Sequence, residues 1–134
     1  VLDGATVLPA LRDGTSIDRD KPMMWWLWHA RGGYEVAMRD GDYKILATML
    51  PQPNPGDFND ARQPENWTIM EFIKKAELGR FEMFNLADDP SETKNLASLK
   101  PERFDLMKKK MIGLHAEIRA EGPEYGLRSR KKKN

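Results

Sequence analysis

The dipeptide Asp40-Gly41 lies between two runs of alternating apolar and polar residues, and it constrains the fold more than any other feature of the chain. Asp-Gly tolerates positive φ at both central positions of a tight turn, and the twist of that turn suits antiparallel strands. The sequence therefore predicts a β-hairpin, with one strand from Tyr34 to Arg39 and the next from Asp42 to Leu50.

A strongly apolar run, Met-Met-Trp-Trp-Leu-Trp-His, precedes the hairpin at residues 23–29. In a strand, Trp25 points to one side of the sheet and Trp26 and Trp28 point to the other. Apolar residues at both parities are typical of a strand that is covered on both faces. We therefore expect a further body of protein against this strand, because three uncovered tryptophans would form a large exposed apolar surface.

Two further segments have helical spacing. The first runs from Trp67 to Leu78 and is expected to end at Gly79, in the position of a C-cap. The second begins at Pro101, a favourable first helical residue, and extends to Gly122-Pro123. Its apolar stripe comprises Phe104, Met107, Met111, Leu114 and Ile118. His115 is adjacent to this stripe and is expected on the helix surface, and a strand is expected from Arg80 to Leu86.

The predicted fold class is α+β, with a small antiparallel sheet of about four strands packed by a long C-terminal helix. Residues 1–22 are expected to form an extended lead-in segment with little regular structure, held by apolar anchors. Residues 23–127 form the predicted subdomain, and residues 128–134 a basic, disordered tail. The proline-rich stretch 51–64 is predicted as a long loop. The anchors of the lead-in segment are Leu2, Val7, Leu8 and Leu11.

Composition restricts the class of protein. The chain has 134 residues, of which 40% are hydrophobic and 32% charged, as in a globular domain. The absence of cysteine excludes disulfides, thiol nucleophiles and cysteine-ligated metal sites. No run approaches the ~20 apolar residues of a membrane span, so no membrane-spanning segment is expected. No nucleic-acid partner is expected either. The chain starts at Val1 rather than at a methionine, and we expect it to be part of a longer protein.

Three motifs occur in a fixed order. The first is Leu2-Asp3-Gly4 through Leu8-Pro9-Ala10-Leu11, and the second is the hairpin segment Ala37 to Ile45. The third is Glu82 to Leu86, followed by Asp89-Pro90-Ser91-Glu92 and Asn95-Leu96-Ala97. In this order they resemble the C-terminal subdomain of the formylglycine-dependent sulfatases, the arylsulfatase branch of the alkaline-phosphatase-like superfamily.

This resemblance implies a parent enzyme that hydrolyses sulfate esters of carbohydrates or aryl groups. In the family, a formylglycine made within a Cys/Ser-x-Pro-x-Arg motif attacks sulfur beside a Ca²⁺ ion. Neither that motif nor a matching cluster of metal ligands occurs in this sequence. The segment is therefore expected to be inactive alone, and its expected partner is the N-terminal catalytic domain of the same protein, in the periplasm or outside the cell.

His29 and Arg31 are the candidate substrate-binding residues, because a loop after the tryptophan-rich strand could reach the mouth of an active site. An imidazole can donate to a sugar hydroxyl or a sulfate oxygen near neutral pH, and the arginine fork suits sulfate. The alternatives are a hydrogen-bonded histidine at the strand end and a solvated loop arginine.

The remaining motif residues are interpreted as structural. Arg39 and Lys44 flank the Asp40-Gly41 turn and are expected to pair with Asp40, Asp42 or the Asp88-Asp89 carboxylates. Asp89 and Pro90 are expected to form a turn with side-chain-to-backbone hydrogen bonds, and Asn95 follows it. The spacing of oxygen ligands there does not match a Ca²⁺ site.

Two other functions are compatible with the sequence. A stand-alone polyanion-binding module would use Arg31, Lys44 and the basic tail. A small independent enzyme would need a nucleophilic set such as Ser16, Asp20 and His29, but nothing in their spacing fixes a geometry.

Overall fold

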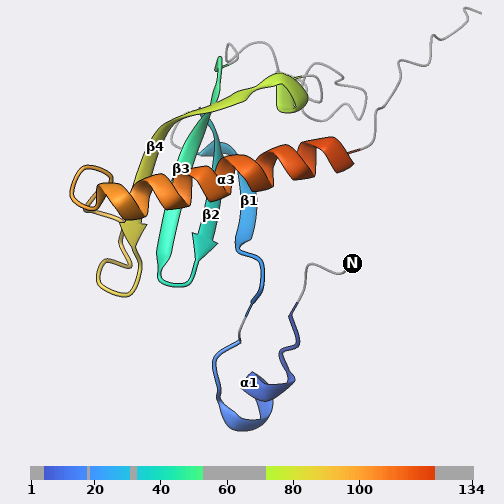
Figure 1. The fold of residues 1–134 in the computed structure, drawn as a ribbon, viewed down its shortest axis with the longest axis vertical. Coiled ribbons are helices and arrows are strands. Elements are labelled where there is room, and N and C mark those ends of the chain that lie inside the picture. The colour runs from blue at the N-terminus through green and yellow to red at the C-terminus, as the bar shows by residue number, and fades with distance from the viewer. Residues whose placement is uncertain (1–4, 18, 31–32, 53–71, 123–134) are drawn as a thin grey trace, which may run out of the picture.

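The computed structural model describes residues 5–17, 19–30, 33–52 and 72–122. Its strands β1 (Met23–Ala30), β2 (Gly33–Asp40), β3 (Tyr43–Leu50) and β4 (Glu77–Asn85) form one antiparallel sheet in the order β1-β2-β3-β4. Helix α1 (Leu8–Asp13) precedes the sheet and the long helix α3 (Pro101–Glu121) follows it (Figure 1). The predicted α+β class, with a four-stranded antiparallel sheet and a C-terminal helix, is confirmed.

The predicted hairpin is formed by β2 and β3. Asp40 and Tyr43 are register partners across the turn, and Gly41 has a φ of 61°, which glycine adopts without steric cost. Arg39 Nε donates a hydrogen bond to the carbonyl oxygen of Gly41 at 2.9 Å. The turn is thus fixed by backbone geometry and by a neighbouring side chain together.

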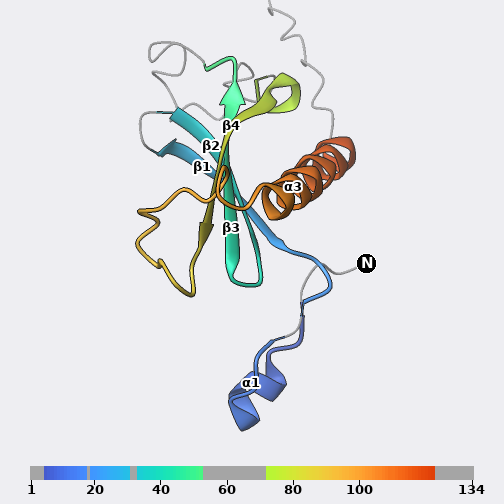
Figure 2. The same cartoon turned by 60° about the vertical axis from the view of Figure 1, so that its left-hand side comes forward.

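Helix α3 covers one face of the sheet (Figure 2). The main core lies between them and contains the largest fully buried side chains. On the opposite face, Ala37, Leu46 and Phe84 form a smaller buried cluster, against which Trp25 packs. Alternation along each strand therefore supplies two unequal cores, and only the larger includes the helix. The large core side chains are Val36, Met38, Ile45, Met49, Met83, Met107 and Met111.

The strand β4 begins earlier than the sequence predicts. The part of the predicted helix 67–78 that lies in the described chain is helical only from Phe72 to Lys75. Gly79 is therefore not a helix C-cap: it lies within β4 opposite Thr48. A Cβ at this position would lie 2.5 Å from Leu50 Cδ1, so the glycine allows the two strands to approach.

The lead-in segment also differs from the expectation, because it contains helix α1. Pro9 lies in the first turn, and Gly14 ends the helix with a φ of 66° and an N–H bonded to Ala10 O at 3.1 Å. The expected anchors that lie in the described residues do not hold the segment: Val7, Leu8 and Leu11 are 49%, 65% and 78% exposed, and Leu2 lies outside the described residues. Helix α1 lies apart from the sheet in both views (Figures 1 and 2).

His115 is buried, contrary to the expectation that it lies on the helix surface. Helix α3 buries Met107, Met111 and His115, which are four residues apart, while Leu114 and Ile118 are only half-buried. The buried stripe is therefore rotated from the predicted one toward His115. Among the described helices, none is long and apolar enough to cross a membrane.

Candidate functional site

The hairpin turn meets the loop after β4 and the first half of α3. Lys44 Nζ forms an ion pair with Glu92 Oε1 at 2.6 Å, and Lys110 forms one with Asp40. The expected partners of Lys44 were Asp40, Asp42 and the Asp88-Asp89 carboxylates, but the carboxylate it meets is at the end of that acidic turn. Side-chain contacts thus connect the hairpin to two segments that are remote in sequence.

Tyr43 contacts the N-terminal end of α3. Lys100 Nζ donates a hydrogen bond to its hydroxyl oxygen at 2.9 Å, and the Arg103 guanidinium lies 4.9 Å from the ring centroid. Both cations interact with the electron-rich face of the phenol ring, as cation–π pairs do. This contact is not predictable from the sequence, because it joins positions that no local pattern connects.

The Asp89-Pro90 turn has the predicted side-chain-to-backbone bonds. Asp89 Oδ2 accepts a hydrogen bond from the Lys94 N–H at 2.8 Å, and Asp89 Oδ1 accepts one from Thr93 Oγ1 at 3.1 Å. These donors, the backbone N–H of Lys94 first, lower the pKa of the Asp89 carboxyl. Both oxygens of this carboxylate therefore stabilise the turn. In the described ranges, no group of three or more histidine and acidic side chains is placed to hold a metal ion.

Asn95 caps the outer edge of β4. Its Oδ1 accepts hydrogen bonds from the Met83 N–H at 3.2 Å and from the Ala97 N–H at 3.0 Å. The next residue, Leu96, donates its N–H to Met83 O at 2.7 Å. The backbone groups of Met83 that point away from β3 are thus both satisfied, and this edge cannot accept another strand there.

A comparable cap is not found at the opposite edge, among the residues that the structure describes. There β1 pairs with β2 only, with Trp25 opposite Ala37 and Trp26 opposite Val36. The prediction that these indoles face opposite sides is confirmed: Trp26 packs on the core beneath α3, and Trp25 packs on the other cluster. Both are half-buried, and Met23 is 41% exposed.

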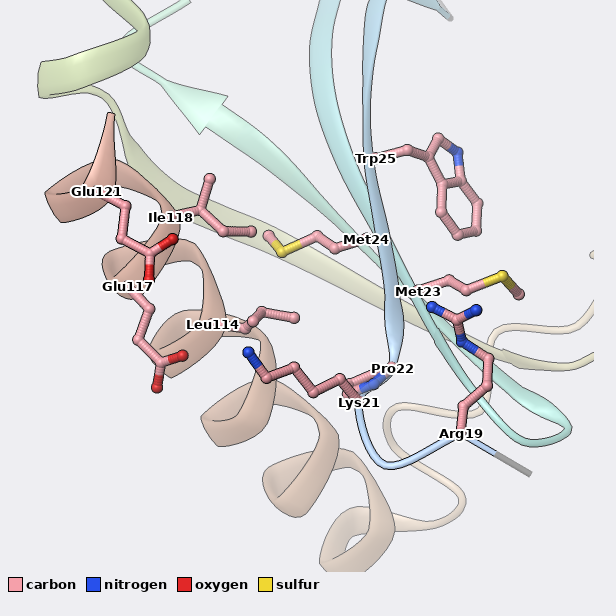
Figure 3. A pocket seen from close by; sticks show the side chains of 10 residues that line it. All are labelled: Arg19, Lys21, Pro22, Met23, Met24, Trp25, Leu114, Glu117, Ile118 and Glu121. Carbon is pink, nitrogen blue, oxygen red and sulfur yellow. The ribbon is translucent and has the colours of Figure 1, made fainter. Parts of the chain in front are cut away.

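A groove of about 390 Å³ lies between the start of β1 and the second half of α3 (Figure 3). Met24 points from β1 toward Leu114 and Ile118, whereas Trp25 points to the other side of the strand. Glu117 and Glu121 form the acidic rim on the helix side. This open side of β1, defined by Met23–Leu27 and the groove, is the best candidate for a binding surface in the described chain.

Two buried nitrogen atoms belong to neighbouring rings near this surface. Trp26 and His115 have ring centroids 6.2 Å apart, and Trp26 Nε1 and His115 Nε2 have no hydrogen-bond partner within the described residues. Burial lowers the pKa of the His115 imidazole, and the nearby Arg119 lowers it further, while Glu77 acts in the opposite direction. The imidazole is therefore held in its neutral form near pH 7.

The structure does not test the predicted substrate-binding role of His29 and Arg31. His29 lies in β1, as expected for a residue near a strand end, but its side chain is outside the described part of the chain, and so is Arg31. Ser16 and Asp20 both precede β1, and neither side chain has a described hydrogen bond or ion pair. The loop 51–64 lies almost entirely outside the described residues, as does the tail 128–134.

Gln52 is a further residue that sequence reasoning missed. Its amide accepts a hydrogen bond from Tyr34 N at 3.0 Å and donates to Tyr34 O at 3.1 Å, so the side chain continues the pairing of β2 beyond the end of β3. Gly33 permits this approach, since a Cβ there would lie 2.8 Å from Gln52 Oε1. A glutamine after a proline gives no sequence signal for such a role.

Comparison with protein-family models gives no match, and neither does comparison with curated proteins. The resemblance to sulfatases therefore rests on the motifs in the sequence.

Proposed function

We propose that this chain is the C-terminal subdomain of a sulfatase that hydrolyses sulfate esters of carbohydrates or aryl groups. In this proposal the subdomain supplies scaffold and part of the substrate-pocket wall, and the catalytic centre lies in an N-terminal domain of the same protein. The enzyme would work in the periplasm or outside the cell, as the resemblance implies.

The observation that carries the proposal is the contact between two of the motifs. The hairpin motif and the third motif contact each other directly. Leu86 N donates a hydrogen bond to Asp42 O at 2.7 Å, and Lys44 forms an ion pair with Glu92. Asn85 is also the register partner of Tyr43. Motif residues thus meet in one structural unit, which is what a shared scaffold requires.

The chemistry of the family is not supplied by the residues of this chain. The sequence has no cysteine and no Ser-x-Pro-x-Arg from which formylglycine could form, and the described residues include no cluster that fits Ca²⁺. Under the proposal, Ca²⁺ and formylglycine belong to the N-terminal domain. The contribution of this chain to substrate would come from His29 and Arg31, at the end of β1 and in the connection to β2.

The stand-alone polyanion-binding module has less support. Three of the basic residues that could serve it already have partners: Lys44 binds Glu92, Lys110 binds Asp40 and Lys100 binds Tyr43. A sulfate group gains less binding free energy from a cation that already has a partner than from one that has none. Such a module would still bind heparin with steep salt dependence, which gives a simple discriminating measurement.

The test of the proposed function is made on the complete polypeptide that contains residues 1–134. We expect a Cys/Ser-x-Pro-x-Arg motif upstream of Val1 and hydrolysis of 4-nitrophenyl sulfate in preference to 4-nitrophenyl phosphate. Replacement of the motif cysteine or serine by alanine should abolish this turnover. A complete polypeptide without the motif, or one whose turnover survives the replacement, would overturn the proposal.

A further inference from the structure

The two edges of the sheet differ in how their backbone groups are satisfied. At β4, Asn95 and Leu96 occupy the outward N–H and C=O of Met83 at 3.2 and 2.7 Å. At β1, no described residue performs this task, and the strand pairs on one side only. Unpaired N–H and C=O groups along a strand form a template for another strand.

The composition of β1 does not protect this edge. Natural edge strands are commonly shielded by lysine, proline or inward-pointing charges, which discourage pairing with another chain. Between Met23 and Leu27 every residue is apolar and uncharged, and Pro22 precedes the strand instead of interrupting it. The edge is therefore suited to pairing, and its backbone groups specify an extended polypeptide as the occupant.

The groove beside β1 adds side-chain selectivity. Successive side chains of an added strand point to opposite faces of the sheet. On the α3 side they would enter the groove beside Met24, Leu114 and Ile118, and on the other side they would lie next to Trp25 (Figure 3). Both positions favour apolar side chains. A strand with apolar residues on both faces therefore fits better than a polar one.

The rim of the groove specifies a charge. Glu117 and Glu121 lie one helical turn apart on α3, both are exposed, and neither has an ion pair or hydrogen bond to a described residue. Arg19 and Lys21 line the groove where the chain enters β1, and both have contacts of their own. Among the described residues, the charge at this rim that lacks a partner is therefore negative, and a basic residue on the incoming strand would complement it.

We propose that the outer edge of β1 receives an extended, apolar polypeptide segment that carries a basic side chain facing Glu117 and Glu121, and so adds a fifth strand to the sheet. This proposal does not depend on the sulfatase assignment, because it follows from the edge, the groove and the rim alone. A second copy of the chain is a poorer occupant, since Met23–Leu27 carries no basic side chain to match the rim.

The test uses the 134-residue chain and a short synthetic peptide of valine and leucine, which is apolar on both faces when extended and includes one lysine. Amide hydrogen exchange, measured by NMR, should show new protection at Met23–Leu27 and none at β4 when the peptide is added. An otherwise identical peptide with proline in place of the central valine should give no protection, because proline has no backbone N–H to donate to the strand pairing.

Charge reversal supplies the second arm. The double variant Glu117→Lys, Glu121→Lys should weaken peptide binding by about tenfold, whereas Glu102→Lys, at the other end of α3, should leave it unchanged. Absence of protection in β1, equal binding by the proline peptide, or equal affinity of all variants would overturn the proposal. So would dimerisation of the free chain through β1, detected by sedimentation, because a second copy would then be the occupant.

Discussion

At the scale of single residues, two kinds of side chain affect stability most directly. One kind is buried without a described hydrogen-bond partner, and the other caps backbone groups. His115 is 4% exposed and lies beside Trp26 with its Nε2 unpartnered among the described residues. Asn95 is exposed, yet its Oδ1 accepts hydrogen bonds from two backbone N–H groups. Exposure alone therefore does not rank the importance of a residue in this fold.

The first prediction concerns the pH dependence of stability. Burial lowers the pKa of His115 below 6.5, so the unfolded state binds more protons than the folded state once the pH falls below that value. The free energy of unfolding should therefore decrease as pH falls from about 7.5 to about 5. Urea denaturation at a series of pH values measures this slope.

The matched variant for this prediction is His115→Leu, which removes the titrating group and the unpartnered nitrogen. Its slope over the same pH range should be smaller than that of the unchanged chain. Asp89 does not interfere, because its pKa is lowered from 3.8, so the stability it contributes is lost only at more acidic pH. An identical slope in the two proteins would contradict the assignment to His115.

The second prediction concerns the cap on β4. Replacing Asn95 with alanine leaves the Met83 N–H without an acceptor, and we expect a loss of about 1–2 kcal/mol in the free energy of unfolding. Asn95→Asp keeps an oxygen acceptor and should lose less. Chemical denaturation compares the three proteins, and equal stability of the alanine and aspartate variants would argue against the cap.

At the scale of secondary-structure elements, α3 connects sequence pattern to packing. Its buried residues Met107, Met111 and His115 recur every four positions. Met107 and Met111 belong to the larger core, and His115 lies beside Trp26. Pro101 begins the helix, and the Gly122 N–H closes it by bonding to Ile118 O at 3.1 Å. The helix is therefore held mainly by the core that it covers, because most helical stability in proteins comes from tertiary packing of an amphipathic face.

The third prediction tests this packing. Met111 is fully buried, so Met111→Ala should create a cavity and lower the free energy of unfolding by about 2–5 kcal/mol. The neighbouring Ile112 is 44% exposed, and Ile112→Ala should change stability much less. Thermal or urea unfolding distinguishes the two, and similar losses for both variants would contradict the orientation of α3.

Local chemistry made the elements predictable to different degrees. The hairpin and the start of α3 follow from Asp40-Gly41 and Pro101, whose backbone preferences act within a few residues. Gly79 was misassigned because a glycine after an apolar helical pattern resembles a C-cap, whereas here it gives room to the Leu50 side chain across the strands. Nothing local distinguishes these two uses of glycine.

Contacts between remote segments were the least predictable part of the candidate surface. The sequence indicated that Trp25 and Trp26 face opposite sides, since alternation is a local property. It did not indicate that β1 lies at the edge of the sheet, nor that Leu114 and Glu117 border its groove. Strand order and helix placement depend on the packing of the whole chain, which no single motif encodes.

At the scale of the whole molecule, the described chain has a well-packed centre and apolar surface at its N-terminal side. Leu8 and Leu11 of α1 are exposed, no residue of α1 is buried, and β1 is open at the edge of the sheet. Exposed apolar side chains and an unpaired edge both favour contact with further polypeptide. They are consistent with the proposal that the chain belongs to a larger enzyme.

The fourth prediction concerns α1 in the chain alone. Because Leu11 is 78% exposed, Leu11→Lys should change the free energy of unfolding by less than about 0.5 kcal/mol. In the complete polypeptide, the same substitution should lower stability or yield if α1 packs on the preceding domain. A large loss in the isolated chain would mean that α1 packs on the sheet.

The most direct measurement of the open edge is amide hydrogen exchange on the chain alone, at a concentration where it is monomeric. We predict that the Met23–Leu27 amides pointing away from β2 exchange at least about tenfold faster than the Met83 amide, which Asn95 caps at the opposite edge. Exchange at Met23–Leu27 as slow as in the central strands would contradict the account, because the edge would then already be paired.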